Sequence, residues 1–220
     1  MKYAAVIFDM DGTLLDTIED IADSMNAALS RLGFPAHPRD KYLEFVGEGI
    51  EILAMKALPE DERSEGNKSH AVETMREEYR TRWSVKTKPY PGIPELLDAL
   101  TEKGINLSIL SNKMDSFTKE MTKALLGRWK FHEVRGLKPG CPRKPDPCGA
   151  KICAESMGVD PGQCIFLGDS GIDMETATRA GMAPFGALWG YQNRNILLGK
   201  GAIVLLEDPG NLLDYIDGDF

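Results

Sequence analysis

The sequence has no apolar run that approaches the roughly 18 residues a membrane span needs. Its N-terminal apolar stretch, residues 3–8, is too short for a secretory signal and is ended at once by Asp9 and Asp11. Excess positive charge is also absent: the formal net charge of the 220 residues is −8. A chain of this charge has no general affinity for nucleic acid or anionic membranes, so we expect neither as a partner.

Cysteine is scarce, and its spacing is not that of the common metal motifs. The four cysteines lie between positions 141 and 164 without a CxxC pair. We interpret them as reduced thiols of a cytoplasmic protein, with a zinc site as the alternative. A GxSxG elbow and an HExxH helix are both absent, so neither a serine hydrolase nor a zinc protease is indicated.

The chain is long enough for one large domain or two modest ones. Residues 4–8 are a continuous apolar run, typical of a strand buried on both faces. Between Thr17 and Lys88 only helical periodicity appears, with helices predicted at 18–32, at about 49–58 and around 72–83. Prolines at positions 89, 91 and 94 then mark a joint between domains.

After this joint, helical and strand patterns alternate. Helices are predicted at 94–103, 116–126, 146–157, 172–180 and near 211–216, and strands at 106–111, near 133–135, at 164–167, 183–188 and 202–206. This alternation predicts a Rossmann-like α/β fold, with a parallel sheet and helices on both of its faces. Because the first strand precedes the helical stretch, that stretch is predicted to be an inserted all-α cap. The expected domains are an α/β core of residues 1–15 and 90–220 and a cap of residues 16–89.

Polar residues follow three of the predicted strands. They are Asp9, Asp11, Ser111, Asn112, Asp169 and Asp173. Ligands of an open parallel sheet bind at the carboxyl ends of its strands, so these side chains are expected to meet at one edge. Lys144 opens the helix predicted to follow it and is expected to join them.

The residue types at this edge indicate phosphate chemistry. Crowded carboxylates raise one another's pKa values, and a hard dication relieves their repulsion. An all-oxygen site with phosphate as co-ligand suits Mg²⁺. The metal and Lys144 would supply the positive charge that the chain as a whole lacks. A carboxylate beside bound phosphate can act as a nucleophile, and a second carboxyl two residues later can protonate the leaving oxygen.

Four segments resemble, in order, the four motifs of the haloacid-dehalogenase superfamily. They are Asp9-Met10-Asp11-Gly12-Thr13, Leu110-Ser111-Asn112, Arg143-Lys144-Pro145 and Gly168-Asp169-Ser170-Gly171-Ile172-Asp173. The layout is similar to that of the phosphoglycolate-phosphatase-like branch, which inserts a small helical cap after the first motif. The resemblance covers nearly the whole chain and is weakest in the cap.

The resemblance implies a role for each residue of the first three motifs. Asp9 would be the nucleophile, and Asp11 would be the general acid and then the general base for the hydrolytic water. Ser111, with neighbouring backbone N–H groups and Asn112, would bind the phosphoryl oxygens. Lys144 would offset the charge of the nucleophile and the phosphate. Such a constellation suffices for phosphoryl transfer, which positioning and electrostatics dominate.

The resemblance also implies a metal site. Mg²⁺ would be bound by Asp9, by the backbone carbonyl of Asp11 and by Asp169. Asp173 would bind it through water or orient the groups that do.

The first motif allows other interpretations. Asp9 and Asp11 could be ordinary turn residues, and an EF-hand loop would need a glycine where Leu14 stands. Within the superfamily, Asp11 favours phosphoryl transfer over dehalogenation, because a leaving halide needs no proton. Ile21 occupies the place of the histidine that mutases of the family carry, and residues 17–32 hold no lysine of the phosphonatase type.

The expected activity is Mg²⁺-dependent hydrolysis of a small phosphomonoester, with phosphoglycolate as the default substrate. A pyrophosphatase, a sugar or nucleotide phosphatase and a catalytically silent binding or regulatory relative are the alternatives. Gly47 and Glu48 either begin a cap helix or form a loop that binds the substrate. The sequence leaves a monomer and a homodimer both open.

Overall fold

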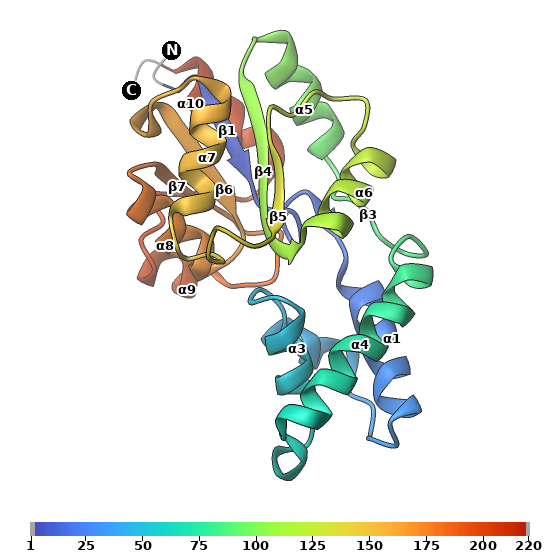
Figure 1. The fold of residues 1–220 in the computed structure, drawn as a ribbon. Coiled ribbons are helices and arrows are strands. Elements are labelled where there is room, and N and C mark those ends of the chain that lie inside the picture. The colour runs from blue at the N-terminus through green and yellow to red at the C-terminus, as the bar shows by residue number, and fades with distance from the viewer. Residues whose placement is uncertain (1–2, 219–220) are drawn as a thin grey trace. The chain divides into compact units, whose positions relative to one another are not determined.

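The computed structural model describes residues 3–218. The chain forms two compact units, Met1–Leu15 with Pro89–Phe220, and Asp16–Lys88 (Figure 1). The two connections between them, β2 (Leu15–Asp16) and β3 (Lys88–Pro89), pair as a two-stranded sheet. Among the described residues, no helix is both long enough and apolar enough to cross a membrane.

The first unit is built on a six-stranded sheet in the order β5-β4-β1-β6-β7-β8. Its strands are β1 (Ala5–Phe8), β4 (Asn106–Met114), β5 (Val134–Leu137), β6 (Cys164–Gly168), β7 (Ala183–Ala187) and β8 (Val204–Leu206). All of its strand pairs are parallel. β1 lies between β4 and β6 and is fully buried, which explains its uninterrupted apolar sequence. The predicted Rossmann-like parallel sheet is confirmed.

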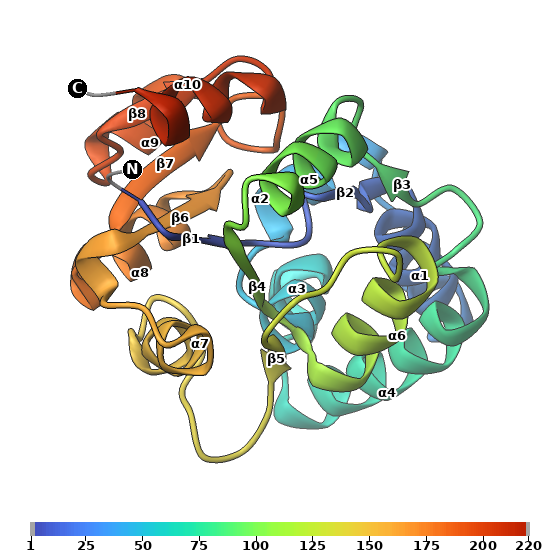
Figure 2. The same cartoon turned by 90° about the horizontal axis from the view of Figure 1, so that it is seen from above.

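Helices cover both faces of this sheet. They are α5 (Ile93–Glu102), α6 (Asp115–Leu125), α7 (Cys148–Met157), α8 (Gly171–Ala180), α9 (Arg194–Gly199) and α10 (Leu212–Asp217). Figure 2 shows α7 and α8 on one face, and α5, α6 and α10 on the other. Small side chains such as Ala150 and Ala177 pack α7 and α8 closely onto Ile7 and Phe166 of the sheet. This packing fixes the strand ends at which the polar residues lie.

Two elements differ from the sequence prediction where they meet the site. β4 continues to Met114, so Ser111 and Asn112 lie inside the strand rather than after it. The extension is stabilised because Met114 pairs with Leu137 of β5, past an irregularity in the register. The helix expected to be opened by Lys144 begins only at Cys148, so Lys144 lies in a loop.

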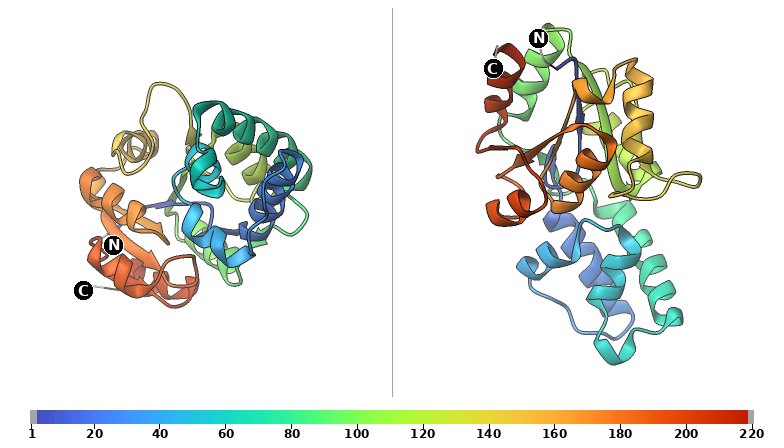
Figure 3. Two further views of the ribbon diagram at one scale, coloured as in Figure 1. Left: turned by 90° about the horizontal axis from the view of Figure 1, so that it is seen from below. Right: turned by 90° about the vertical axis from the view of Figure 1, so that its left-hand side faces the viewer.

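The second unit is helical. It contains α1 (Ile18–Arg31), α2 (Tyr42–Phe45), α3 (Ile50–Ala57) and α4 (Glu65–Arg82). α1 and α4 lie side by side, as Figure 3 shows, and both bury apolar side chains such as Met25 and Met75. Buried Asp20 accepts hydrogen bonds from the backbone N–H groups of Lys86 and Thr87 and so ties the first helix to the end of the unit.

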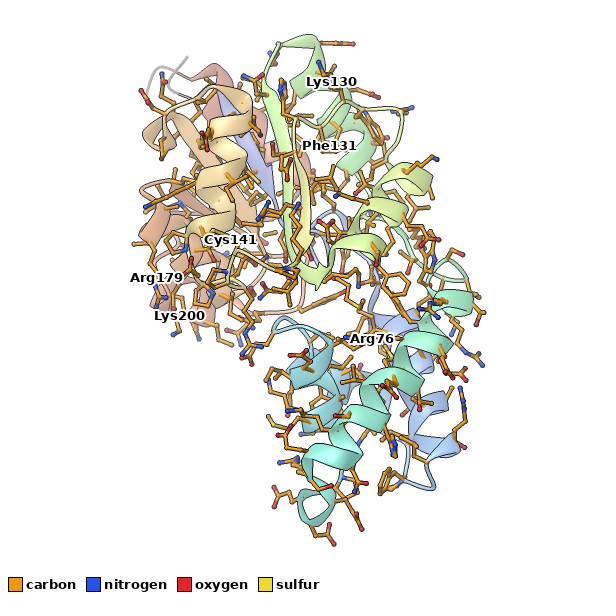
Figure 4. The ribbon with its side chains drawn as sticks, in the orientation of Figure 1. Arg76, Lys130, Phe131, Cys141, Arg179 and Lys200 are labelled. Carbon is orange, nitrogen blue, oxygen red and sulfur yellow. A yellow bond between two sulfur atoms is a disulfide. The ribbon has the colours of Figure 1, made fainter. Side chains whose placement is uncertain are left out.

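The cysteines correct one expectation. Cys141 and Cys148 form a disulfide with their Cα atoms 5.9 Å apart. It joins the loop after β5, where Figure 4 labels Cys141, to the first residue of α7. The expectation that all four cysteines are reduced thiols is therefore wrong for Cys141 and Cys148. A separation of seven residues did not by itself indicate this disulfide. The two cysteines come together because the chain between them folds back through a turn, in which the Asp146 N–H donates to the Arg143 carbonyl. Cys153 and Cys164 are free and buried.

Candidate active site

The structure brings Asp9 and Lys144 into contact. Asp9 directly follows β1, and its backbone N–H donates to the Leu167 carbonyl of β6, which fixes it at the edge of the sheet. Lys144 Nζ lies 2.8 Å from Asp9 Oδ1 and 2.6 Å from Asp173 Oδ1. The Lys144 side chain is only 3% exposed, so these two carboxylates are its main source of charge compensation.

Asp173 is held by the start of α8. Its Oδ2 accepts hydrogen bonds from the backbone N–H of Ser170, at 3.1 Å, and from the Ser170 hydroxyl, at 2.6 Å. The Ser170 side chain in turn caps the helix by accepting from the Asp173 N–H. This capping box is a common way to satisfy the first N–H groups of a helix. Here it also presents the other oxygen of Asp173 to Lys144.

Asp169, just after β6, is fixed by groups from two other segments. Its Oδ1 accepts from the Thr13 hydroxyl at 3.1 Å, and its Oδ2 accepts from the Tyr191 backbone N–H at 2.7 Å. Gly12 has a φ of +88°, and a Cβ atom there would collide with the Asp169 carboxylate. A Cβ atom at Gly190 would collide with Asp169 as well. Both glycines are thus needed for the close approach of these segments.

The carboxylates of Asp9, Asp169 and Asp173 form a buried group in which one oxygen of each lies within 4.8 Å of the other two. Burial, followed by the charge of Asp173, raises the pKa of Asp9 to about 7, although the Lys144 ammonium opposes this shift. Burial and the charges of Asp173 and Asp9 also raise the pKa of Asp169 well above its usual range. Burial by itself lowers the pKa of Lys144, but the negative charges of Asp173 and Asp9 have the larger effect, so the pKa of this lysine is raised.

When all three of these buried carboxyls are ionised, the Lys144 ammonium balances one of them and two negative charges are left uncompensated. A divalent cation would balance them, and a set of carboxylate oxygens suits a hard cation such as Mg²⁺. The residues present therefore fit a divalent metal. Within the described part of the chain the chelating group consists of aspartates, so the zinc alternative finds no support there.

Asn112 acts on the loop that carries Lys144. Its side-chain Oδ1 accepts from the Lys144 N–H at 2.8 Å, and its Nδ2 donates to the Lys144 carbonyl at 3.1 Å. These two bonds hold the backbone of the loop, where the Lys144–Pro145 peptide bond is cis. Ser111 Oγ accepts from the backbone N–H of Lys113 at 3.1 Å, and its own hydroxyl proton can be donated to an anion. The expected part of Asn112 in phosphate binding stays a prediction.

Asp11 has a partner that the sequence did not indicate. Its carboxylate is not part of the buried acidic group; Oδ1 lies 3.0 Å from Lys113 Nζ instead. Lys113 directly follows the second motif, and this position next to the motif is the one feature of the sequence that could have marked it as a site residue. Tyr191 was also missed, because it acts through its backbone N–H and the residue type carries no information about that contact.

Gly47 and Glu48 lie in the helical unit, between α2 and α3. The φ angles of Gly47 and Gly49 are +107° and +89°, which only glycine adopts readily. Glu48 Oε1 forms an ion pair with Lys56 Nζ at 2.9 Å. These features account for the glycines as a helix entry, and a part in substrate binding stays a prediction.

Known proteins share the fold of this chain. A model of the haloacid dehalogenase-like hydrolase family matches residues 6–187. The chain belongs to this family. The predicted superfamily is thereby confirmed, and the protein is an enzyme of the hydrolase class.

Relatives of this haloacid dehalogenase-like hydrolase match it along nearly its whole length. A phosphoglycolate phosphatase of Aquifex aeolicus is 34% identical over 212 residues, which cover 96% of each chain. An N-acetylmuramic acid 6-phosphate phosphatase of Pseudomonas aeruginosa is 30% identical and covers 99% of this chain and 96% of its own. The crystal structure of a proposed phosphoglycolate phosphatase from Lactobacillus delbrueckii subsp. bulgaricus covers 100% of both chains at 29% identity, with a TM-score of 0.92.

Proposed function

We propose that this hydrolase is a Mg²⁺-dependent phosphatase that removes phosphate from a small phosphomonoester through an aspartyl phosphate at Asp9. The observation that carries the proposal is the buried group of three carboxylates, Asp9, Asp169 and Asp173, two of which contact the buried ammonium of Lys144. A purely structural cluster of this kind would be costly, because buried carboxylates repel one another. Such arrangements are common where a site must bind an ion and do chemistry.

In the first step, a carboxylate oxygen of Asp9 forms a bond to the phosphorus atom as the bond from phosphorus to the ester oxygen breaks. Asp11 donates its proton to that departing oxygen, so the leaving group departs as a neutral alcohol. Lys144 stays charged and offsets the negative charge on Asp9 and on the transferring phosphoryl group. The Ser111 hydroxyl donates a hydrogen bond to a phosphoryl oxygen.

In the second step, water attacks the phosphorus atom of the aspartyl phosphate. Asp11, now ionised, accepts a proton from that water, and the bond between phosphorus and the Asp9 oxygen breaks. This releases inorganic phosphate and restores both carboxyl groups to their starting states. The same residue thus serves as acid and then as base.

The metal would be held by the carboxylates of Asp9 and Asp169 and the backbone carbonyl of Asp11, with Asp173 acting through water. When bound, Mg²⁺ supplies electrostatic stabilisation of the phosphoryl oxygens. The chain's own contribution is to hold these oxygens in place. Thr13 and the Tyr191 N–H orient Asp169, and the Ser170 cap orients Asp173.

Phosphoglycolate is the substrate we propose first, because relatives named phosphoglycolate phosphatase match nearly the whole chain. N-acetylmuramic acid 6-phosphate is a second candidate, on the basis of the similar Pseudomonas aeruginosa enzyme. Both are small phosphomonoesters with a carboxylate. We further propose that residues 16–89 act as a cap that selects the substrate, with Gly47 and Glu48 taking part, and that the enzyme works in the cytoplasm.

The test is a screen of small phosphate esters, pyrophosphate and nucleotides, each with Mg²⁺ and after chelation. Metal-dependent phosphate release is expected, fastest from phosphoglycolate or a related carboxylated ester. Preference for pyrophosphate, or for sugar phosphates or nucleotides, would redirect the substrate assignment within the family. No release from any compound would contradict the phosphatase proposal and favour a silent relative with a binding or regulatory role.

A further inference from the structure

We infer that Lys113 is a positioning residue, which orients the Asp11 carboxyl for proton transfer to the leaving group. The inference rests on the proposed phosphatase function. Its basis is the 3.0 Å contact between Lys113 Nζ and Asp11 Oδ1. The two side chains are 10% and 19% exposed, so water screens this ion pair less than a surface pair.

The backbone of Lys113 is firmly held, so its side chain starts from a fixed point. Its N–H donates to Ser111 Oγ at 3.1 Å. Gly136 of β5 packs against the same segment so closely that a Cβ atom there would lie 2.6 Å from the Lys113 carbonyl oxygen. The Gly136 N–H donates to Asp115 Oδ1 at 3.0 Å, which ties β5 to the start of α6, two residues after Lys113.

The backbone of Asp11 is also held in place. The turn after β1 is closed by the Gly12 N–H, which donates to the Leu15 carbonyl at 2.9 Å, and Asp11 itself forms a β-bridge with Leu15. With both backbones fixed, the contact through Oδ1 restricts rotation of the Asp11 carboxyl and so sets the direction of both its oxygens. Proton transfer is sensitive to such geometry, because donor and acceptor must come within hydrogen-bond reach.

The two lysines at this edge therefore have separate tasks. Lys144 contacts Asp9 and Asp173, where the phosphoryl group is transferred. Lys113 contacts Asp11, which handles the proton. Loss of Lys113 should consequently harm those substrates whose leaving group needs a proton and largely spare those whose leaving group does not.

The experiment measures kcat/KM with Mg²⁺ for a series of aryl and alkyl phosphates whose leaving groups differ in pKa. This parameter reports on steps up to the release of the alcohol or phenol, before hydrolysis of the phospho-enzyme. Wild-type enzyme, Lys113→Met and Lys113→Arg are compared. Lys119→Met is the matched control, since this exposed lysine of α6 pairs with Asp115 rather than with an active-site group.

For Lys113→Met we expect kcat/KM to fall about tenfold to hundredfold for alkyl phosphates and less than about threefold for p-nitrophenyl phosphate. The plot of log kcat/KM against leaving-group pKa should therefore become steeper. Lys113→Arg keeps the charge in a different shape and should give an intermediate slope; it carries the test if the methionine variant does not fold. Lys119→Met should leave the slope unchanged.

An equal loss for all leaving groups, or none, in folded Lys113→Met or Lys113→Arg would overturn the inference while the phosphatase proposal stands. A wild-type enzyme that hydrolyses none of the esters would overturn the phosphatase proposal, and with it the role of Lys113. A thermal unfolding curve of each variant identifies the folded ones.

Discussion

Replacement of Lys144 by methionine should destabilise the metal-free protein in a pH-dependent way. The substitution keeps the approximate length and apolar stem of the side chain but removes the ammonium that lies 2.8 Å from Asp9 and 2.6 Å from Asp173. At an effective dielectric constant of about 20, each contact is a gross attraction of about 6 kcal/mol. Much of it is offset by the cost of burying the charges, and removing one partner of a buried pair has a net cost of about 3–5 kcal/mol.

The pH dependence follows from Asp9, whose pKa is already raised to about 7. Without the ammonium this pKa rises further. Below pH 7 the folded protein carries a protonated Asp9 in both wild type and variant, so that carboxyl adds little to the difference. Between pH 7 and pH 8 the wild type ionises Asp9 but the variant does not, which costs the variant about 1.4 kcal/mol more. The loss of stability should therefore be larger at pH 8 than at pH 6.

Denaturant unfolding at pH 6 and at pH 8, with a chelator present, measures both quantities. Lys151→Met is the matched control, because Lys151 is an exposed residue of α7 and should change stability by less than about 0.5 kcal/mol. A loss of under about 1 kcal/mol at pH 8, or the same loss at both pH values, would refute the electrostatic account of the buried cluster.

Three further predictions concern the same cluster. Asp9→Asn should abolish turnover yet raise the unfolding midpoint of the metal-free protein at pH 8, because one of three repelling carboxylates is lost; an unchanged rate in a phosphatase assay would contradict the nucleophile assignment. Gly190→Ala should weaken Mg²⁺ binding in calorimetry, since its Cβ would displace Asp169, whereas Gly162→Ala, with nothing within 4 Å, should not. Mg²⁺ affinity should rise by at least about tenfold per pH unit below pH 7, with proton release, because bound metal requires ionised Asp9 and Asp169, whose pKa values are both raised; a pH-independent affinity would refute this.

Much of the α/β unit could be predicted because its signals are local. The run Ala5–Phe8 is apolar since β1 is buried on both faces, and the alternation of helices and strands is specific to a parallel sheet. The meeting of Asp9, Lys144 and Asp173 followed from a general rule about strand ends. The spacing of these three residues along the chain did not by itself indicate that they meet.

The remainder depends on contacts that residue types do not encode. The extension of β4 to Met114 requires the partner Leu137, and the Cys141–Cys148 disulfide requires a turn between the two cysteines. Tyr191 reaches Asp169 through its backbone, so no side-chain pattern points to it. Lys113 adjoins a predicted motif, yet only the three-dimensional structure shows that it faces Asp11.

The proposed mechanism requires a covalent phosphoryl group on the side chain of Asp9, directly after β1. Enzyme mixed with substrate and Mg²⁺ can be quenched in acid within a turnover and reduced with borohydride, which converts a phosphorylated aspartate to homoserine that peptide mass spectrometry locates. We expect this conversion at Asp9, more of it in Asp11→Asn, and none in Asp9→Asn. Steady phosphate release with no modification at Asp9, or with modification at another residue, would contradict the proposed mechanism.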